Sequence, residues 1–236
     1  ARYGTSNSGT MKTIYRIGLG HRYGRSMQTI AGIHYNFSLP DEFWRVLQKH
    51  KNNQQSLQDF KTDSYFGLIR NFRRNFWLLI YLFGASPAVC SCFVKDRNHQ
   101  LQPFPSAEQT HYLPYATSLR MGDLGYQSDA QKSLIVNYNN LSDYLKTLCG
   151  AITQSHPAYE HIGVKDAAGN YQQLNTSLLQ IENEFYSSIR PKRTTARGET
   201  ALQALLVRGV EYVEVRCVDL NPYEPLGITV EQMQVM

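Results

Sequence analysis

The sequence predicts an α+β fold with a mostly antiparallel sheet. Its strand-like segments are separated by helices of unequal length and by a hairpin at residues 162–171, which does not fit regular βαβ units. Neither GxGxxG nor GxxxxGKS/T occurs, so neither a Rossmann nucleotide fold nor a Walker phosphate loop is supported. Apolar residues make up 42% of the 236 positions and charged residues 18%, which is enough to bury a core.

Apolar residues at helical spacing and capping residues predict the helices in chain order. Residues 5–8 cap a helix over 11–22, and Pro40 begins a short helix at 41–44. The longest helix covers 63–83. Two further helices cover 139–152 and 201–208, and Gly209 ends the last one. Strands are expected at 28–39, 178–186 and 210–220. Residues 49–58 and 95–109 are polar and are expected to form loops.

The three expected strands place polar side chains on a shared face, because successive residues of a strand point to opposite faces. The grouped residues are His34, Asn36 and Ser38 in the first strand, Gln180, Glu182, Glu184 and Tyr186 in the second, and Tyr212, Glu214 and Arg216 in the third. Carboxylate, imidazole and guanidinium groups together suit a divalent metal and a phosphate. The pattern predicts one wall of a metal–nucleotide site.

A plainer explanation stays open, because alternating Glu also occurs on solvated strands that carry salt bridges. Arg216 lies two residues after Glu214, where it could grip a phosphoryl group or form an ion pair within its own strand. Arg120 could hold a substrate carboxylate with both arms of its guanidinium group.

The composition narrows the partners to small molecules. Net charge is +5, from 24 basic and 19 acidic residues, and the basic residues form no continuous stripe of the kind that binds nucleic acid. The four cysteines show no zinc-binding spacing, and Cys217 falls on the apolar side of its strand. The longest apolar run, 76–85, is too short to span a bilayer. We expect a cytoplasmic protein that binds anionic small molecules.

Seven segments, taken together, carry a specific resemblance that runs through the chain in order. They read YGTSN at 3–7, QTIAGIHYNFS at 28–38, YLFGASPA at 81–88, YLPYATSLR at 112–120, LQIENE at 179–184, IRPKR at 189–193 and EYVEVR at 211–216. In these segments the chain closely resembles the central part of proteobacterial glutamate–cysteine ligases, the enzymes of the first step of glutathione synthesis.

The resemblance implies a glutamine synthetase-like fold, with a curved, mostly antiparallel sheet and helices packed on its outer face. It implies Mg²⁺ or Mn²⁺ and ATP as co-substrate. ATP would phosphorylate the γ-carboxylate of L-glutamate, and the amine of L-cysteine would attack the resulting acyl phosphate. It also implies a monomer when full length, with no nucleic acid or membrane partner.

Residue roles follow from the same resemblance. His34 and Glu214 look like metal ligands, and Arg16 and Arg216 like the pair that grips the transferring phosphoryl group. Arg120 looks like the clamp for the glutamate α-carboxylate. Tyr15, Tyr126 and Tyr186 look like the lining of the cysteine site, and Asn36 is a further candidate substrate contact. Arg190, Lys192 and Arg193 are expected in a mobile loop that closes over ATP, because Pro191 interrupts strand pairing.

The chain is expected to be a central fragment, residues 1–236 of one catalytic domain, without the N-terminal and C-terminal segments of the family. The family takes further metal-binding carboxylates from an N-terminal segment, so the isolated chain is expected to lack a complete set of ligands. Two alternatives stay open. One is a related carboxylate–amine ligase with another amine acceptor, and the other is an incomplete fragment that acts only as a folded module.

Overall fold

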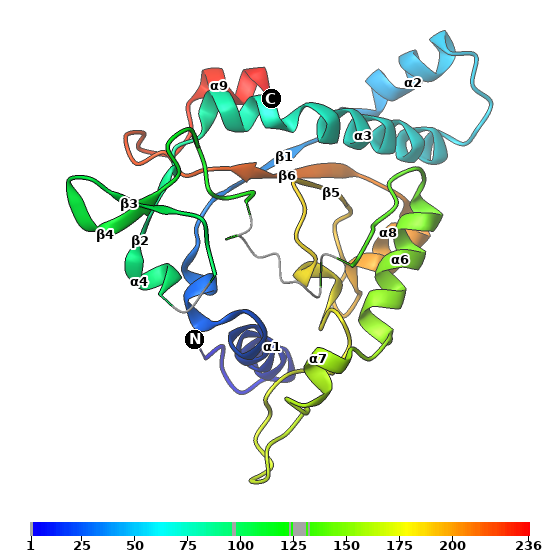
Figure 1. The fold of residues 1–236 in the computed structure, drawn as a ribbon. Coiled ribbons are helices and arrows are strands. Elements are labelled where there is room, and N and C mark those ends of the chain that lie inside the picture. The colour runs from blue at the N-terminus through cyan, green and yellow to red at the C-terminus, as the bar shows by residue number, and fades with distance from the viewer. Residues whose placement is uncertain (1, 96–97, 123, 125–130, 132) are drawn as a thin grey trace. The chain divides into compact units, whose positions relative to one another are not determined.

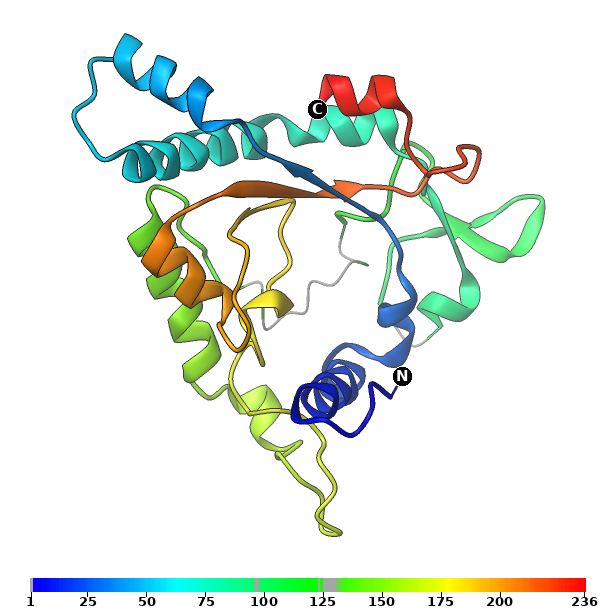
Figure 2. The ribbon, with the colours of Figure 1, turned by 180° about the vertical axis from the view of Figure 1, so that it is seen from behind.

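The computed structural model describes residues 2–95, 98–122, 124, 131 and 133–236. The chain divides into two compact units, one made of residues 1–30 and 126–186 and the other of residues 31–125 and 187–236 (Figures 1 and 2). In the part of the chain that the structure describes, no helix is both long enough and apolar enough to cross a membrane.

A three-stranded antiparallel sheet lies at the centre of the second unit. Strand β6 (Tyr212–Val218) pairs on one side with β1 (Ile33–Phe37) and on the other with β5 (Ile189–Lys192). Burial alternates along β6, where Val213, Val215 and Cys217 are buried. The long helix α3 (Leu57–Phe83) packs against β5 and β6 and runs along the sheet (Figure 1). One face of this sheet is therefore apolar and covered by a helix.

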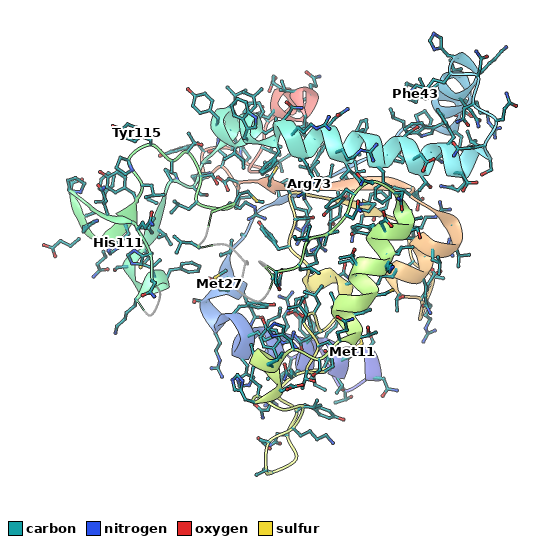
Figure 3. The ribbon with its side chains drawn as sticks, turned by 45° about the vertical axis from the view of Figure 1, so that its right-hand side comes forward. Met11, Met27, Phe43, Arg73, His111 and Tyr115 are labelled. Carbon is teal, nitrogen blue, oxygen red and sulfur yellow. The ribbon has the colours of Figure 1, made fainter. Side chains whose placement is uncertain are left out.

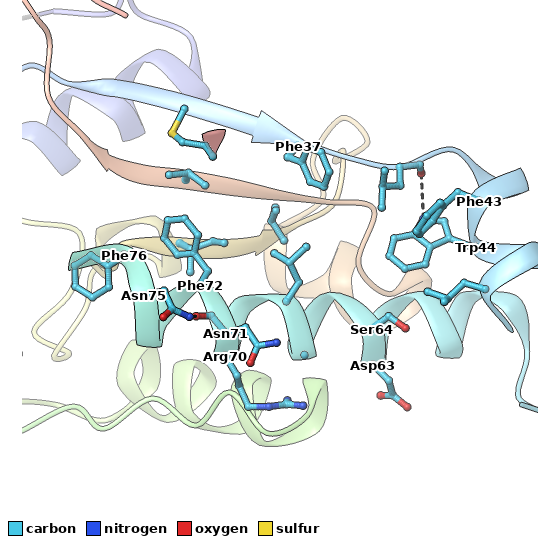
Figure 4. A pocket seen from close by; sticks show the side chains of 18 of the residues that line it. Phe37, Phe43, Trp44, Asp63, Ser64, Arg70, Asn71, Phe72, Asn75 and Phe76 are labelled. Atoms are coloured by element: carbon cyan, nitrogen blue, oxygen red, sulfur yellow. Dashed lines mark hydrogen bonds between the residues drawn. The ribbon is translucent and has the colours of Figure 1, made fainter. Parts of the chain in front are cut away.

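An apolar groove of about 1140 Å³ lies between this face and α3 (Figure 4). Strand residues Tyr35 and Phe37 line it together with Phe72 and Phe76 of α3. At one end, the indole nitrogen of Trp44 donates a hydrogen bond to the carbonyl of Leu39. The alternation predicted from the sequence therefore has a structural basis, because the apolar half of each strand lines this groove.

Polar contacts fix the start of β6 against the first turns of α3. The Thr62 hydroxyl accepts a hydrogen bond from the backbone nitrogen of Val210 at 3.1 Å, and the Gln58 amide donates to the Val210 carbonyl at 3.0 Å. At the other end of the helix, the buried Asp219 carboxylate accepts from the backbone nitrogen of Ala85 at 3.0 Å. These contacts hold β6 in place along the helix.

Smaller elements complete the second unit. They are α2 (Asp41–His50), β2 (Ala88–Cys90), α4 (Ser91–Val94), β3 (Gln102–Phe104), β4 (Ala107–Tyr112), α8 (Ala201–Arg208) and α9 (Val230–Val235). Strands β2, β4 and β3 form a second antiparallel sheet in that order. The aromatic residues Phe43 on α2 and Tyr115 after β4 are exposed on these peripheral parts (Figure 3).

The first unit is built from helices and irregular segments. It contains α1 (Asn7–Tyr23), the 3₁₀ turn η1 (Arg25–Thr29), α6 (Leu141–Thr153), α7 (Pro157–Glu160) and the 3₁₀ turn η2 (Glu182–Glu184). The Ser6 side chain caps α1 and the Asn140 side chain caps α6, each by accepting a hydrogen bond from a backbone N–H of the first turn. Buried Leu148 and Leu179 belong to the core of this unit.

The sequence predicts the helices better than the strands. All five predicted helices are present, and α8 has the predicted bounds with Gly209 at its end. The first strand is shorter than expected, because residues 25–29 form a 3₁₀ turn. The expected loop at 95–109 is wrong where β3 and the start of β4 pair. The loop at 49–58 is also shorter, because helices extend into both of its ends.

The strand predicted at 178–186 is wrong. This segment is irregular and contains the turn η2, and its backbone bonds to side chains and to carbonyls at the end of α6 in place of a strand partner. Glu184 accepts from the backbone nitrogen of Gln180 at 2.7 Å, and Asn175 donates to the carbonyl of Gln180 at 3.0 Å. The alternating pattern of this segment therefore does not reflect a strand.

Cys217 provides a test of the packing of β6. Burial raises the pKa of its thiol to about 11, so about one thiol in a thousand is ionised at pH 8. We expect alkylation of Cys217 in the native protein to be at least about a hundredfold slower than that of an ordinary exposed thiol. Peptide-level mass spectrometry after timed alkylation measures this rate, with the exposed Cys149 as internal control. Equal labelling of the two cysteines would show that the face of β6 beneath α3 is open.

Candidate active site

The polar face of the sheet brings together His34, Glu214 and Arg216, as the alternation predicts. The Nδ1 atom of His34 lies 3.5 Å from Oε1 of Glu214, and Nε of Arg216 lies 3.6 Å from Oε2 of the same carboxylate. Arg216 also donates from Nε to Nε2 of His34 at 3.4 Å. The three side chains form one cluster that spans β1 and β6.

His34 lies where the pairing of β1 with β6 shifts by one residue, between Ile33 and Tyr35. The extra residue is on β6, where Arg216 and Cys217 both stand opposite His34, and such a bulge bends the strand that carries it. Burial, and after it the Arg216 guanidinium, lowers the pKa of His34 against the opposing effect of Glu214. The imidazole is therefore neutral at neutral pH, and because Nε2 accepts from Arg216, Nδ1 carries the proton and faces Glu214.

Two further cations come from β5. Arg190 is directly opposite Glu214 in the strand register and is buried, and the Lys192 Nζ lies 3.9 Å from Oε2 of Glu214. The mobile loop predicted here is therefore wrong for these two residues. Pro191 fits into β5 because this strand is at the edge of the sheet, where a proline does not remove a hydrogen bond to a neighbouring strand.

Arg193 follows β5 and lies among structural contacts. Its Nη1 donates to the Arg208 carbonyl at 2.9 Å and to the Gln58 side chain at 3.2 Å, and its Nε lies 3.7 Å from the Glu211 carboxylate. These contacts connect the end of β5 to α3 and α8. Arg193 therefore anchors the end of β5, a role that the sequence did not indicate. The predicted contact of Arg193 with ATP stays a prediction.

Arg120 is held close to the same polar face. Its Nε donates to the Arg216 carbonyl and its Nη1 to the Ala31 carbonyl, both at 2.9 Å. The guanidinium packs directly against Gly32, where a Cβ atom would overlap it. Two of the five N–H groups of the Arg120 guanidinium thus donate to backbone carbonyls. A carboxylate can bind at its Nη1–Nη2 edge.

Asn36 lies on the exposed side of β1, opposite Glu214 in the strand register. Its place on the predicted polar face is therefore confirmed. Its contact with substrate stays a prediction.

The donor set suits a metal ion only in part. The neutral imidazole of His34 and the carboxylate of Glu214 are groups that divalent metals accept. Among residues 2–95, 98–122, 124, 131 and 133–236, however, no group of three or more His, Cys, Asp or Glu side chains forms a metal-binding cluster. The described residues therefore offer two ligands, and a metal ion would need others.

Three of the other residues to which the resemblance assigns a role lie in the first unit. Tyr15 and Arg16 are neighbours on α1, with the Arg16 guanidinium 5.9 Å from the centre of the Tyr15 ring, and both are half-buried. Tyr186 is buried at the end of the irregular segment after η2. Tyr126 lies outside the residues that the structure describes.

A buried ion pair in the first unit was missed by sequence reasoning. Nη1 of Arg22 lies 3.2 Å from Oε1 of Glu184, and the two side chains are 0% and 1% exposed. The Arg22 guanidinium also stacks on Tyr159, 4.1 Å from the ring centre. Glu184 therefore does not belong to the polar sheet face on which the sequence placed it. An arginine on the buried side of a helix is the only sequence signal for this pair.

The comparisons with known proteins agree on one family. The model of the family described as glutamate-cysteine ligase matches residues 1–236. The chain is 64% identical over 236 residues to a glutamate–cysteine ligase of Saccharophagus degradans and 58% identical over 240 residues to one of Alcanivorax borkumensis. These alignments cover 100% of this chain but 44% and 45% of the relatives.

Solved structures give the same result. A crystal structure of glutamate–cysteine ligase from Francisella tularensis in complex with AMP is 44% identical, with a TM-score of 0.90 over 99% of this chain and 45% of that chain. A bifunctional glutathione synthetase from Pasteurella multocida is 27% identical, with a TM-score of 0.65 over 99% of this chain and 25% of that chain. The chain thus spans less than half the length of these relatives, and it belongs to the glutamate–cysteine ligase family.

Proposed function

We propose that the full-length gene product that contains this chain is an ATP-dependent ligase. It joins the γ-carboxylate of L-glutamate to the amine of L-cysteine, in the first step of glutathione synthesis. Family membership supports this proposal, and so does the AMP complex of the Francisella relative. The observation that carries it is the cluster of Arg190, Lys192 and Arg216 around the single carboxylate of Glu214.

The chemistry explains why so many cations are useful. A carboxylate is a poor acyl donor, because its leaving group would be oxide. Transfer of the γ-phosphoryl group from ATP releases ADP and forms γ-glutamyl phosphate; the cysteine amine then attacks that carbonyl carbon, phosphate leaves, and the amine loses a proton. Two like charges at 4 Å repel by about 4 kcal/mol at an effective dielectric constant near 20, so the approach of ATP to glutamate requires local neutralisation.

Each cation has a proposed task. Arg216 binds the transferring phosphoryl group, and Arg16 is assigned the same task from the resemblance. Arg120 binds the α-carboxylate of glutamate through its Nη1–Nη2 edge, because its other contacts fix the orientation of that edge. Arg190 and Lys192 bind ATP phosphates, since both lie beside Glu214 on the same sheet.

We propose that His34 and Glu214 are two of the ligands of Mg²⁺ or Mn²⁺, and that the remaining carboxylates come from outside this chain. Such an ion would neutralise phosphate charge when ATP is bound. The lowered pKa of His34 favours this role, because only the neutral imidazole can bind a cation. The ion pairs of Glu214 with Arg216 and Lys192 are long, at 3.6 and 3.9 Å, and a stronger ligand can replace them.

The remaining assignments complete the proposal. Tyr15, Tyr126 and Tyr186 line the cysteine site, and Asn36 contacts substrate. The protein is cytoplasmic and a monomer when full length. The competing functions are ligation of a different amine acceptor and a folded module without activity.

A product assay on the full-length protein separates these functions. We expect γ-glutamylcysteine, ADP and phosphate in equal amounts, detected by mass spectrometry, with cysteine preferred over other amino acids. Glutamate labelled with ¹⁸O in its γ-carboxylate should transfer one ¹⁸O atom to phosphate, because the acyl phosphate loses that oxygen. Product only with another amine would favour the first alternative, and no ATP consumption with any amine would favour the second.

Gly32→Ala tests the role of Arg120. The added methyl group overlaps the guanidinium and should displace it from the Ala31 and Arg216 carbonyls. We expect the KM for glutamate to rise by about tenfold or more, which corresponds to the loss of roughly one charge-assisted hydrogen bond. Steady-state kinetics measures this change. Gly150→Ala is the matched control, because a Cβ atom there meets only open space. An unchanged KM for glutamate in the folded variant would contradict the role of Arg120.

Arg216→Lys tests the phosphoryl grip. A guanidinium group holds two oxygens at once, whereas an ammonium group is a compact point charge. We expect turnover to fall by about two to three decades, as when other transition-state donors are removed, with little change in glutamate binding. Kinetics at saturating cysteine measures both quantities. Near-normal turnover with a raised KM for glutamate would show that Arg216 and Arg120 have exchanged roles.

A further inference from the structure

The first unit contains a buried polar network centred on the Glu184 carboxylate. Its Oε1 accepts from the Tyr23 hydroxyl at 2.6 Å and from Nη1 of Arg22 at 3.2 Å, and its Oε2 accepts from the backbone nitrogen of Gln180 at 2.7 Å. Arg22 donates further to Gln173 at 2.9 Å. Both carboxylate oxygens are therefore used at short distances, in a site that is closed to water.

One branch of the network leads to Tyr15. The backbone of Gln180 is held by Glu184, and the Gln180 side chain donates to the carbonyl of Tyr15 at 3.3 Å. The Gln180 amide packs so closely on Gly18 that a Cβ atom there would overlap it. This contact fixes the distance between α1 and the segment that carries Gln180, and so fixes the backbone of Tyr15.

The other branch leads to Tyr186. The Tyr23 hydroxyl, which donates to Glu184, accepts from the Gln131 side chain at 2.9 Å. The side-chain oxygen Oε1 of Gln131 in turn accepts a hydrogen bond from the backbone nitrogen of Tyr186 at 3.5 Å. Glu184 is also two residues before Tyr186 in the chain. The same carboxylate is thus connected to both tyrosines by no more than three hydrogen bonds.

A buried ion pair contributes little to stability on balance, because removing two charges from water offsets most of their attraction. What such a pair provides is a unique geometry, since each group has few alternative partners. A network of this kind suits the positioning of two side chains that must hold one small substrate.

We propose that Glu184, with Arg22 and Tyr23, is a positioning device that sets Tyr15 and Tyr186 for recognition of the cysteine side chain. This inference rests on the proposed function, in which both tyrosines line the cysteine site. Glu184 touches no substrate and acts only through the two tyrosines. Its loss should therefore change the choice of amine acceptor more than the transfer of phosphate.

The test uses two variants of the full-length protein. Glu184→Gln keeps the shape of the side chain and removes its charge, and Tyr23→Phe keeps the Arg22–Glu184 pair but removes the hydroxyl that leads to Gln131. We expect the KM for cysteine to rise by about tenfold in the first and by about threefold to tenfold in the second, with the KM for glutamate and for ATP within about twofold of wild type. The preference for cysteine over 2-aminobutyrate, which lacks the thiol, should fall in both.

The controls are Glu160→Gln and Tyr171→Phe, which make the same chemical changes on exposed residues of the same unit. If the network only stabilises the fold, the variants will lose melting temperature and active fraction, but the KM for cysteine and the preference over 2-aminobutyrate will stay at wild-type values. That result in folded Tyr23→Phe overturns the proposal, even if Glu184→Gln fails to fold. A wild-type protein that makes no γ-glutamylcysteine overturns the proposed function itself, and this is seen before any variant is compared.

Discussion

The carboxylate of Glu214, on the middle strand of the main sheet, is the charge on which the polar face depends. It is flanked by Arg216 in the same strand and by Lys192 and Arg190 across β5. Cations gathered on one partly buried face repel one another. Glu214 offsets this repulsion, and the apolar face beneath, packed against α3, keeps the strands in the register that the cluster needs.

Alternation along two strands made the central cluster predictable from sequence. His34, Glu214 and Arg216 share one face because the odd-numbered residues of β6 are buried and the odd-numbered aromatic residues of β1 line the groove beside α3, which leaves the polar residues on the other face. The bulge at His34 and the contact of Arg120 with Gly32 were not predictable, because both depend on how separate segments meet. The roles of Arg16, Tyr15 and Tyr126 came only from resemblance to the family.

Two predictions from the sequence, the strand at 178–186 and the loop at 190–192, were wrong because each depends on contacts with distant parts of the chain. The segment around Glu184 shows the alternation of a strand, and Pro191 interrupts the pattern of one, yet the first is irregular and the second lies in β5. Sequence periodicity reports which side chains are buried, and a buried ion pair such as Arg22–Glu184 imitates an exposed polar face in that pattern. The effect of a proline depends on whether its strand is at a sheet edge, which is decided by residues far away in the chain.

Glu184 and Glu214 are carboxylates in two different settings, one fully buried and hydrogen-bonded and the other partly exposed. Glu184 accepts three hydrogen bonds at 2.6 to 3.2 Å with a side chain that is 1% exposed, so exchange of its partners would require the unit to open. The Glu214 side chain is 13% exposed, and its cationic neighbours Arg216 and Lys192 lie at 3.6 and 3.9 Å, beyond the length of a strong charge-assisted hydrogen bond. A carboxylate in the first setting keeps its hydrogen-bond partners in fixed positions. One in the second setting keeps its cations nearby without binding them tightly, as the function proposed above requires if phosphates are to bind these cations and a metal ion is to bind the carboxylate. The length of these contacts, more than the kind of residue, separates a carboxylate whose partners are fixed from one whose partners can be exchanged.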